Sequence, residues 1–104
     1  MAFVEVARVD DLEPGSATCV EVDGERVGLY RLADGSFRAI GDMCTHVGAP
    51  LHEGHVEGEI VFCPLHLAQF DLNTGRALTE PAFLDAPAYR VRVEGGAVLL
   101  EPVV

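Results

Sequence analysis

A chain of 104 residues, 49% of them apolar, fits one small domain with a modest core. The chain has 17 acidic side chains, seven arginines and no lysine. The resulting formal charge of −10 argues against nucleic acid and anionic membranes as partners. No apolar run is long enough to span a membrane, and the N-terminus lacks the basic and apolar blocks of a secretory signal. We therefore expect a soluble, cytoplasmic protein.

Short runs of alternating apolar and polar residues, bounded by turn residues, follow one another along the chain and predict strands, not helices. The expected strands are 3–9, 17–22, 26–32, 37–40, 60–62, 70–72, 89–93 and 97–100. Asp23-Gly24 and Gly95-Gly96 suit tight hairpin turns, which need positive backbone φ angles. Only 9–12 suggests a helical turn. The pattern predicts one all-β domain of about eight to ten short strands.

Two Cys/His pairs lie between these expected strands. Cys44 and His46 form the first pair, and Cys63 and His66 form the second, with 16 residues between the pairs. Two thiolates and two imidazoles suit either a tetrahedral zinc ion or an unequal two-iron cluster. Zinc ribbons usually take two cysteines from one loop, whereas each loop here is mixed. Mixed loops favour a [2Fe-2S] centre in which cysteines hold one iron and histidines hold the other.

The stretches CTHVGAPLHEG (44–54) and CPLHLAQFDLNTGRALTEPA (63–82) resemble the ligand loops of Rieske proteins. The chain as a whole is similar to the small Rieske-type ferredoxins of bacterial ring-hydroxylating dioxygenases. The resemblance implies an antiparallel, ISP-like Rieske fold over residues 1–104, with a small cluster-binding subdomain formed by the two ligand loops at about 41–81. It also implies that one [2Fe-2S] cluster has Cys44 and Cys63 on one iron and His46 and His66 on the other.

The same resemblance implies a one-electron carrier and not an enzyme. Its expected partners are a flavin-dependent ferredoxin reductase and a terminal oxygenase, which dock on the monomer near His46 and His66. A complete terminal oxygenase would need a second domain with a mononuclear iron, for which 104 residues leave no room. Two alternatives stay open: the small Rieske-like subunit of an assimilatory nitrite reductase, and a zinc-stabilised interaction module.

The residues around the ligands predict a low reduction potential. High-potential Rieske proteins carry a disulfide between the loops and two hydroxyl groups that donate hydrogen bonds to cluster sulfur. The corresponding positions here are Ala49, Leu65, Ala68 and Phe70. Without these groups, we expect a midpoint of roughly −150 mV, at the low end of the Rieske range. Leu67 departs from the family, which usually has glycine directly after the second histidine.

The remaining cysteine and histidines are not expected to act in this chemistry. Cys19 lies in an apolar run, and we predict an inert, buried side chain. His52 and His55 lie between the two ligand pairs, but the four ligand positions are already filled. We predict that both are solvated loop histidines.

Overall fold

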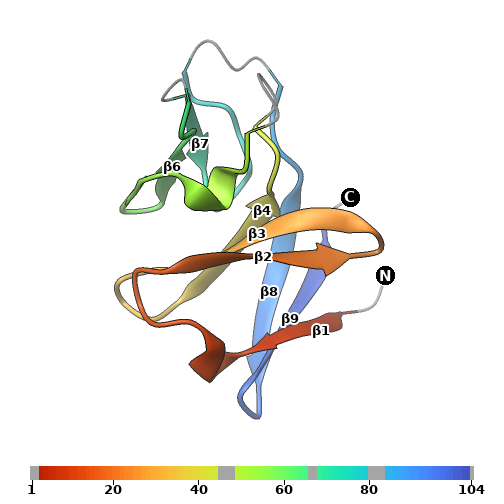
Figure 1. The fold of residues 1–104 in the computed structure, drawn as a ribbon. Helices are drawn as coiled ribbons and strands as arrows, with labels where there is room; N and C mark the ends of the chain where they lie inside the picture. The colour runs from red at the N-terminus through yellow and green to blue at the C-terminus, as the bar shows by residue number, and fades with distance from the viewer. Residues whose placement is uncertain (1–2, 45–48, 66–67, 80–83, 104) are drawn as a thin grey trace.

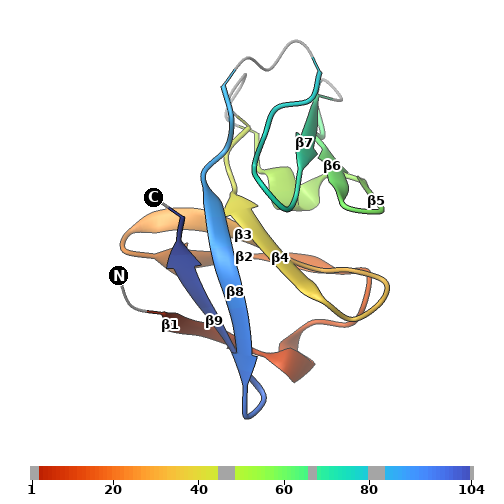
Figure 2. The ribbon, with the colours of Figure 1, turned by 180° about the vertical axis from the view of Figure 1, so that it is seen from behind.

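The computed structural model describes residues 3–44, 49–65, 68–79 and 84–103, and its strands form two antiparallel sheets (Figures 1 and 2). The larger sheet has six strands in the order β1-β9-β8-β4-β3-β2. These strands are β1 (Val4–Arg8), β2 (Ala17–Val22), β3 (Glu25–Arg31), β4 (Phe37–Gly41), β8 (Ala88–Glu94) and β9 (Ala97–Pro102). The smaller sheet consists of β5 (Val56–Glu57), β6 (Ile60–Phe62) and β7 (Gln69–Asp71).

The eight expected strands all form, with bounds within two residues of the prediction. The helical turn expected at 9–12 is the 3-10 turn η1 (Val9–Asp11). Two further elements were not predicted: the two-residue strand β5 and the 3-10 turn η2 (Leu51–Glu53). In the part of the chain that the structure describes, no helix is long and apolar enough to cross a membrane.

Glycines close the hairpins as the sequence predicts. Asp23 and Gly24 both have positive φ, and β2 pairs with β3 directly on either side of them. Gly95 and Gly96 do the same between β8 and β9. Both turns match the right-handed twist of the strands that they join.

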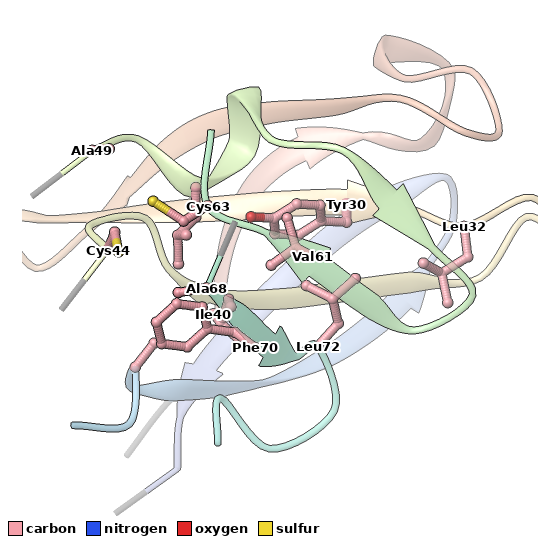
Figure 3. Packing of buried hydrophobic residues seen from close by; sticks show 12 residues of the cluster. Tyr30, Leu32, Ile40, Cys44, Ala49, Val61, Cys63, Ala68, Phe70 and Leu72 are labelled. Carbon is pink, nitrogen blue, oxygen red and sulfur yellow. The ribbon is translucent and has the colours of Figure 1, made fainter. Parts of the chain in front are cut away.

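The smaller sheet packs on one end of the larger one through a shared apolar core (Figure 3). Val61, Phe70 and Leu72 of the segment 60–72 are in contact with a cluster that includes Tyr30 and Ile40 of the larger sheet. A second cluster of buried residues comes mainly from strands of the larger sheet and includes Leu29, Val98 and Leu100. The chain segments that follow β4 and β6 therefore begin in a close-packed core.

Candidate metal centre

The two predicted cysteine ligands lie at the ends of strands, close to the shared core. Cys44 follows β4 after two intervening residues, and Cys63 directly follows β6. Both side chains are at most 1% exposed and belong to the same buried cluster (Figure 3). His46 and His66 lie outside the described residues.

The two ligand loops begin and close in the same way. The backbone N–H of Cys44 donates a 2.7 Å hydrogen bond to the carbonyl of Ala49, and the N–H of Cys63 donates a 2.7 Å bond to the carbonyl of Ala68. In both cases the acceptor is five residues further along the chain. Each cysteine therefore occupies the equivalent, hydrogen-bonded first position of its loop.

The strand pairing next to each loop repeats the same arrangement. Met43, which precedes the first cysteine, forms a bridge with Pro50, and Phe62, which precedes the second, pairs with Gln69. The residues that flank each loop are therefore paired in an antiparallel arrangement, and the register is the same for both loops. The repeat C-x4-A in the sequence is the signal that could have predicted this equivalence.

The two cysteines and their neighbours fit an iron-sulfur cluster. Neither Cys44 nor Cys63 forms a disulfide. Ala68 and Phe70, at the positions where hydroxyl donors occur in high-potential relatives, are fully buried and bring no polar side-chain atom to the cysteines. Two thiols on matched loops above an apolar floor can hold one iron and keep water away from its sulfur ligands.

Large apolar side chains are exposed beside the two loops. Met43, Leu65 and Leu84 are each more than 60% exposed, and each lies next to a ligand loop or to the segment 80–83. Leu51, by contrast, is fully buried beneath the first loop.

The prediction for His52 is wrong, because its ring is paired with a buried carboxylate. The side chain is only 18% exposed, and Nδ1 lies 2.8 Å from Oδ2 of Asp42, whose side chain is 1% exposed. The backbone N–H of His52 also donates a 2.8 Å hydrogen bond to Asp42 Oδ1. The prediction for His55 is consistent with the structure, since its side chain is 69% exposed.

Asp42 is the residue that the sequence prediction missed. It lies two positions before Cys44, and its carbonyl accepts a 2.6 Å hydrogen bond from Leu51 in η2. Its carboxylate also faces the Arg26 guanidinium, with Nη2 3.4 Å from Oδ2. Asp42 interrupts the mainly apolar segment 37–43. This position in the sequence could have predicted that its carboxylate is buried and paired.

Cys19 is half-buried and not fully buried as predicted. It lies on β2, the edge strand of the larger sheet, where a neighbouring strand covers one side only. Arg26 Nε donates a 3.4 Å hydrogen bond to its sulfur. This hydrogen bond, followed by the charges of Cys19 and Asp42, raises the pKa of Arg26.

Tyr30 carries a buried hydroxyl that has no hydrogen-bond partner among the residues described. The residue is 1% exposed. Burial raises the pKa of this phenol far above its usual value, and the neighbouring Asp42 and Cys19 add to the effect. Tyr30 therefore stays neutral, and its hydroxyl is a buried donor without an acceptor in the described part of the chain.

The chain is similar in sequence to a family of iron-sulfur proteins and to several of its curated members. The family model for the Rieske [2Fe-2S] domain matches residues 2–90. The ferredoxin component of the naphthalene 1,2-dioxygenase/salicylate 5-hydroxylase systems of Ralstonia sp is 35% identical over 99 residues, which is 95% of this chain and 94% of that protein.

Solved structures lead to the same class. The ferredoxin of carbazole 1,9a-dioxygenase from Nocardioides aromaticivorans IC177 superposes with a TM-score of 0.89 and 38% identity, over 99% of this chain and 100% of that one. A chain from the complex of reduced oxygenase and oxidized ferredoxin in carbazole 1,9a-dioxygenase has a TM-score of 0.87 and 30% identity, with 98% and 96% covered. A Mycobacterium tuberculosis protein described as an NADH-dependent nitrite reductase small subunit is also similar, with a TM-score of 0.86 and 29% identity over 99% and 96% of the chains.

Proposed function

The chain belongs to the Rieske [2Fe-2S] family, and on that premise we propose that it is a one-electron carrier that passes electrons from a flavin reductase to a terminal oxygenase. The observation that carries the proposal is the pair of buried cysteines on two loops closed by the same backbone hydrogen bond. Like its ferredoxin relatives, the protein is an electron-transfer component and not itself a catalyst. The pathway that it serves would oxidise an aromatic substrate.

The cofactor is a Rieske [2Fe-2S] cluster. Such a cluster takes up and releases a single electron without large structural change. We assign Cys44 and Cys63 to one iron and His46 and His66 to the other. The protein's own contribution is to hold the two thiolates in equivalent positions and to keep their surroundings apolar, because Ala49, Ala68 and Phe70 add no polar side-chain atom.

The potential follows from these apolar neighbours. Hydrogen bonds to cluster sulfur stabilise the reduced form and raise the potential. Ala68 and Phe70 are fully buried and offer none, and Ala49 and Leu65 exclude a disulfide between the loops. We expect roughly −150 mV. Protein-film voltammetry measures it, and a clearly positive midpoint at pH 7 would contradict this reasoning.

The oxygenase is a partner of this class of ferredoxin, as the carbazole 1,9a-dioxygenase complex illustrates. On this chain, we propose that it docks over the exposed side chains Met43, Leu65 and Leu84 beside the ligand loops. The reductase would use the same face in turn, and the carrier would act as a monomer. The charge of −10 would speed encounters with basic partner surfaces at low salt.

We further propose that the chain acts as one domain in the cytoplasm, with residues of about 41–81 as the cluster-binding subdomain. The smaller sheet and both cysteines lie within that segment.

A role as a nitrite reductase small subunit is the second candidate, supported by the Mycobacterium tuberculosis structure. The ferredoxin role is favoured because the ferredoxin relatives reach 38% identity against 29%. A zinc-stabilised module is disfavoured by the family match.

The ligand assignment is tested with His46→Ala and His66→Cys, and with His55→Ala as the matched control, because His55 is exposed and lies in the same region. We expect the control to keep a Rieske-type EPR signal after reduction. Each ligand variant should lose or shift that signal. An unchanged signal in either ligand variant would contradict the assignment, and electron transfer to a cognate oxygenase measured in parallel tests the carrier role separately.

A further inference from the structure

Three potential metal ligands outside the Cys/His pairs meet beneath the first ligand loop. Cys19, Asp42 and His52 each place one ligand atom within 4.8 Å of those of the other two. They come from three separate elements: β2, the segment after β4, and η2. Sulfur, carboxylate oxygen and imidazole nitrogen are together the donor types of zinc sites.

Gly28 lets the side chains of Asp42 and Tyr30 pack closely against the sheet next to Cys19. Cys19 pairs with Gly28 across β2 and β3, so both residues face the same side of the sheet. A Cβ at Gly28 would lie 3.0 Å from Asp42 Oδ1 and 3.0 Å from the hydroxyl of Tyr30. A side chain at position 28 would displace the carboxylate or the phenol, so glycine allows both groups to lie next to Cys19.

Tyr30 is a second, independent pointer to a ligand. The residue is 1% exposed, and its buried hydroxyl has no hydrogen-bond partner within the described segments, although it packs beside Gly28 and the Asp42 carboxylate. Leaving a buried hydroxyl unpaired costs about 1 to 3 kcal/mol. A water molecule bound to a metal ion held by the three donors would give the hydroxyl a partner.

Arg26 now supplies the positive charge at this place. Its guanidinium lies 3.4 Å from both Cys19 Sγ and Asp42 Oδ2, yet its side chain is 61% exposed. A salt bridge with one exposed partner is weak. The guanidinium can therefore swing into solvent when another cation takes its place.

We propose that Cys19, Asp42 and His52 form a binding site for a divalent transition-metal ion of the zinc class, distinct from the iron-sulfur centre. His52 would bind through Nδ1, which leaves its N–H on Nε2, 3.9 Å from a carboxylate oxygen of Glu53. A carboxylate beside the second ring nitrogen is the usual companion of a metal-bound histidine. A water that donates to or accepts from Tyr30 completes the four ligands.

The ion would link the edge strand β2, through Cys19, to Asp42 and His52 on either side of the first ligand loop. Because this site shares no ligand with the proposed cluster, the inference does not depend on the electron-carrier function. It predicts that zinc raises the thermal stability of the protein by mass action without changing the cluster.

The test is calorimetric titration of the intact holoprotein with Zn2+, with the visible spectrum recorded to confirm that the cluster is retained. We expect one saturable site. Cys19→Ser and His52→Ala should each weaken zinc binding by about 100-fold or more, since even outer partners of a metal are worth about 10- to 100-fold. Tyr30→Phe should weaken it by about tenfold. Arg26→Gln should tighten it, because the competing cation is removed.

His55→Ala is the matched control and should bind zinc as the wild type does, since His55 lies outside the cluster of donors. Cd2+ should give an ultraviolet thiolate charge-transfer band in the wild type and none in Cys19→Ser. Zinc affinity that is equal in all variants would show adventitious binding to the acidic surface and overturn the proposal. Absence of a saturable site, or weaker binding by Arg26→Gln, would overturn it as well.

Discussion

Replacing Asp42 with alanine tests whether the buried carboxylate holds the base of the first ligand loop. The Asp42 carboxylate accepts a 2.8 Å hydrogen bond from the backbone N–H of His52, and one of its oxygens lies 2.8 Å from Nδ1 of the same residue. The alanine variant leaves the N–H and the half-buried ring without their acceptor. The change also removes the charge that faces Arg26.

The size of the effect can be worked from these contacts. Leaving the buried N–H of His52 without an acceptor costs about 1 to 3 kcal/mol, and the loss of the imidazole's hydrogen bond to a carboxylate costs about 1.5 to 3 kcal/mol more. Arg26 adds little, because its side chain is 61% exposed. At about 4 to 8 °C per kcal/mol for a domain of this size, a loss of about 3 kcal/mol lowers the melting temperature by about 12 to 24 °C.

The assay is thermal unfolding of the holoprotein, followed by circular dichroism and by the visible absorbance of the cluster. Asp10→Ala is the control, because Asp10 is exposed and the variant has the same change in net charge. Its melting temperature should stay within about 3 °C of the wild type. If Asp42→Ala melts together with Asp10→Ala, the carboxylate does not stabilise the loop and the reasoning fails.

Three further substitutions have distinct expected outcomes. Gly54→Ala places a Cβ against the carbonyl oxygen of Phe62 and should lower the melting temperature. The control Gly58→Ala should lower it less, because its Cβ meets open space and adds only the positive-φ strain of about 1 to 2 kcal/mol. Equal shifts in the two variants would contradict the steric argument. A buried hydroxyl without a partner costs about 1 to 3 kcal/mol, and Tyr30 has none among the described residues, so Tyr30→Phe in metal-free buffer should raise the melting temperature by about 4 to 24 °C. A decrease would contradict this reasoning. Phe70→Ala empties the apolar floor and should cost about 3 to 5 kcal/mol, seen in denaturant unfolding, with earlier loss of cluster colour.

The strands could be predicted because their signals are local. Alternating residues and a glycine turn lie within a few positions of one another, as at Asp23-Gly24, where the turn alone fixes the pairing of β2 with β3. β5 was missed because two residues cannot show a period. The 3-10 turn η2 was missed because its first N–H binds the Asp42 carbonyl, a contact that reaches back nine positions.

The Asp42 network could not be predicted for the same reason. His52 lies ten positions after Asp42, and Cys19 lies on another strand, so no local pattern brings the three together. From the sequence alone, His52 resembles any polar loop residue. Its burial follows only when the loop folds back and the Asp42 carboxylate needs a donor.

The matched closure of the two ligand loops places a cysteine at the start of each one. Cys44 and Cys63 each take the first position after a strand, where a backbone hydrogen bond of 2.7 Å fixes them against the buried core. Residues later in each loop are further from that anchor along the chain. We therefore expect the two thiolates to form the fixed, dry side of the centre and the two histidines to form its outer side. An electron should then leave through His46 or His66, next to the exposed Leu65.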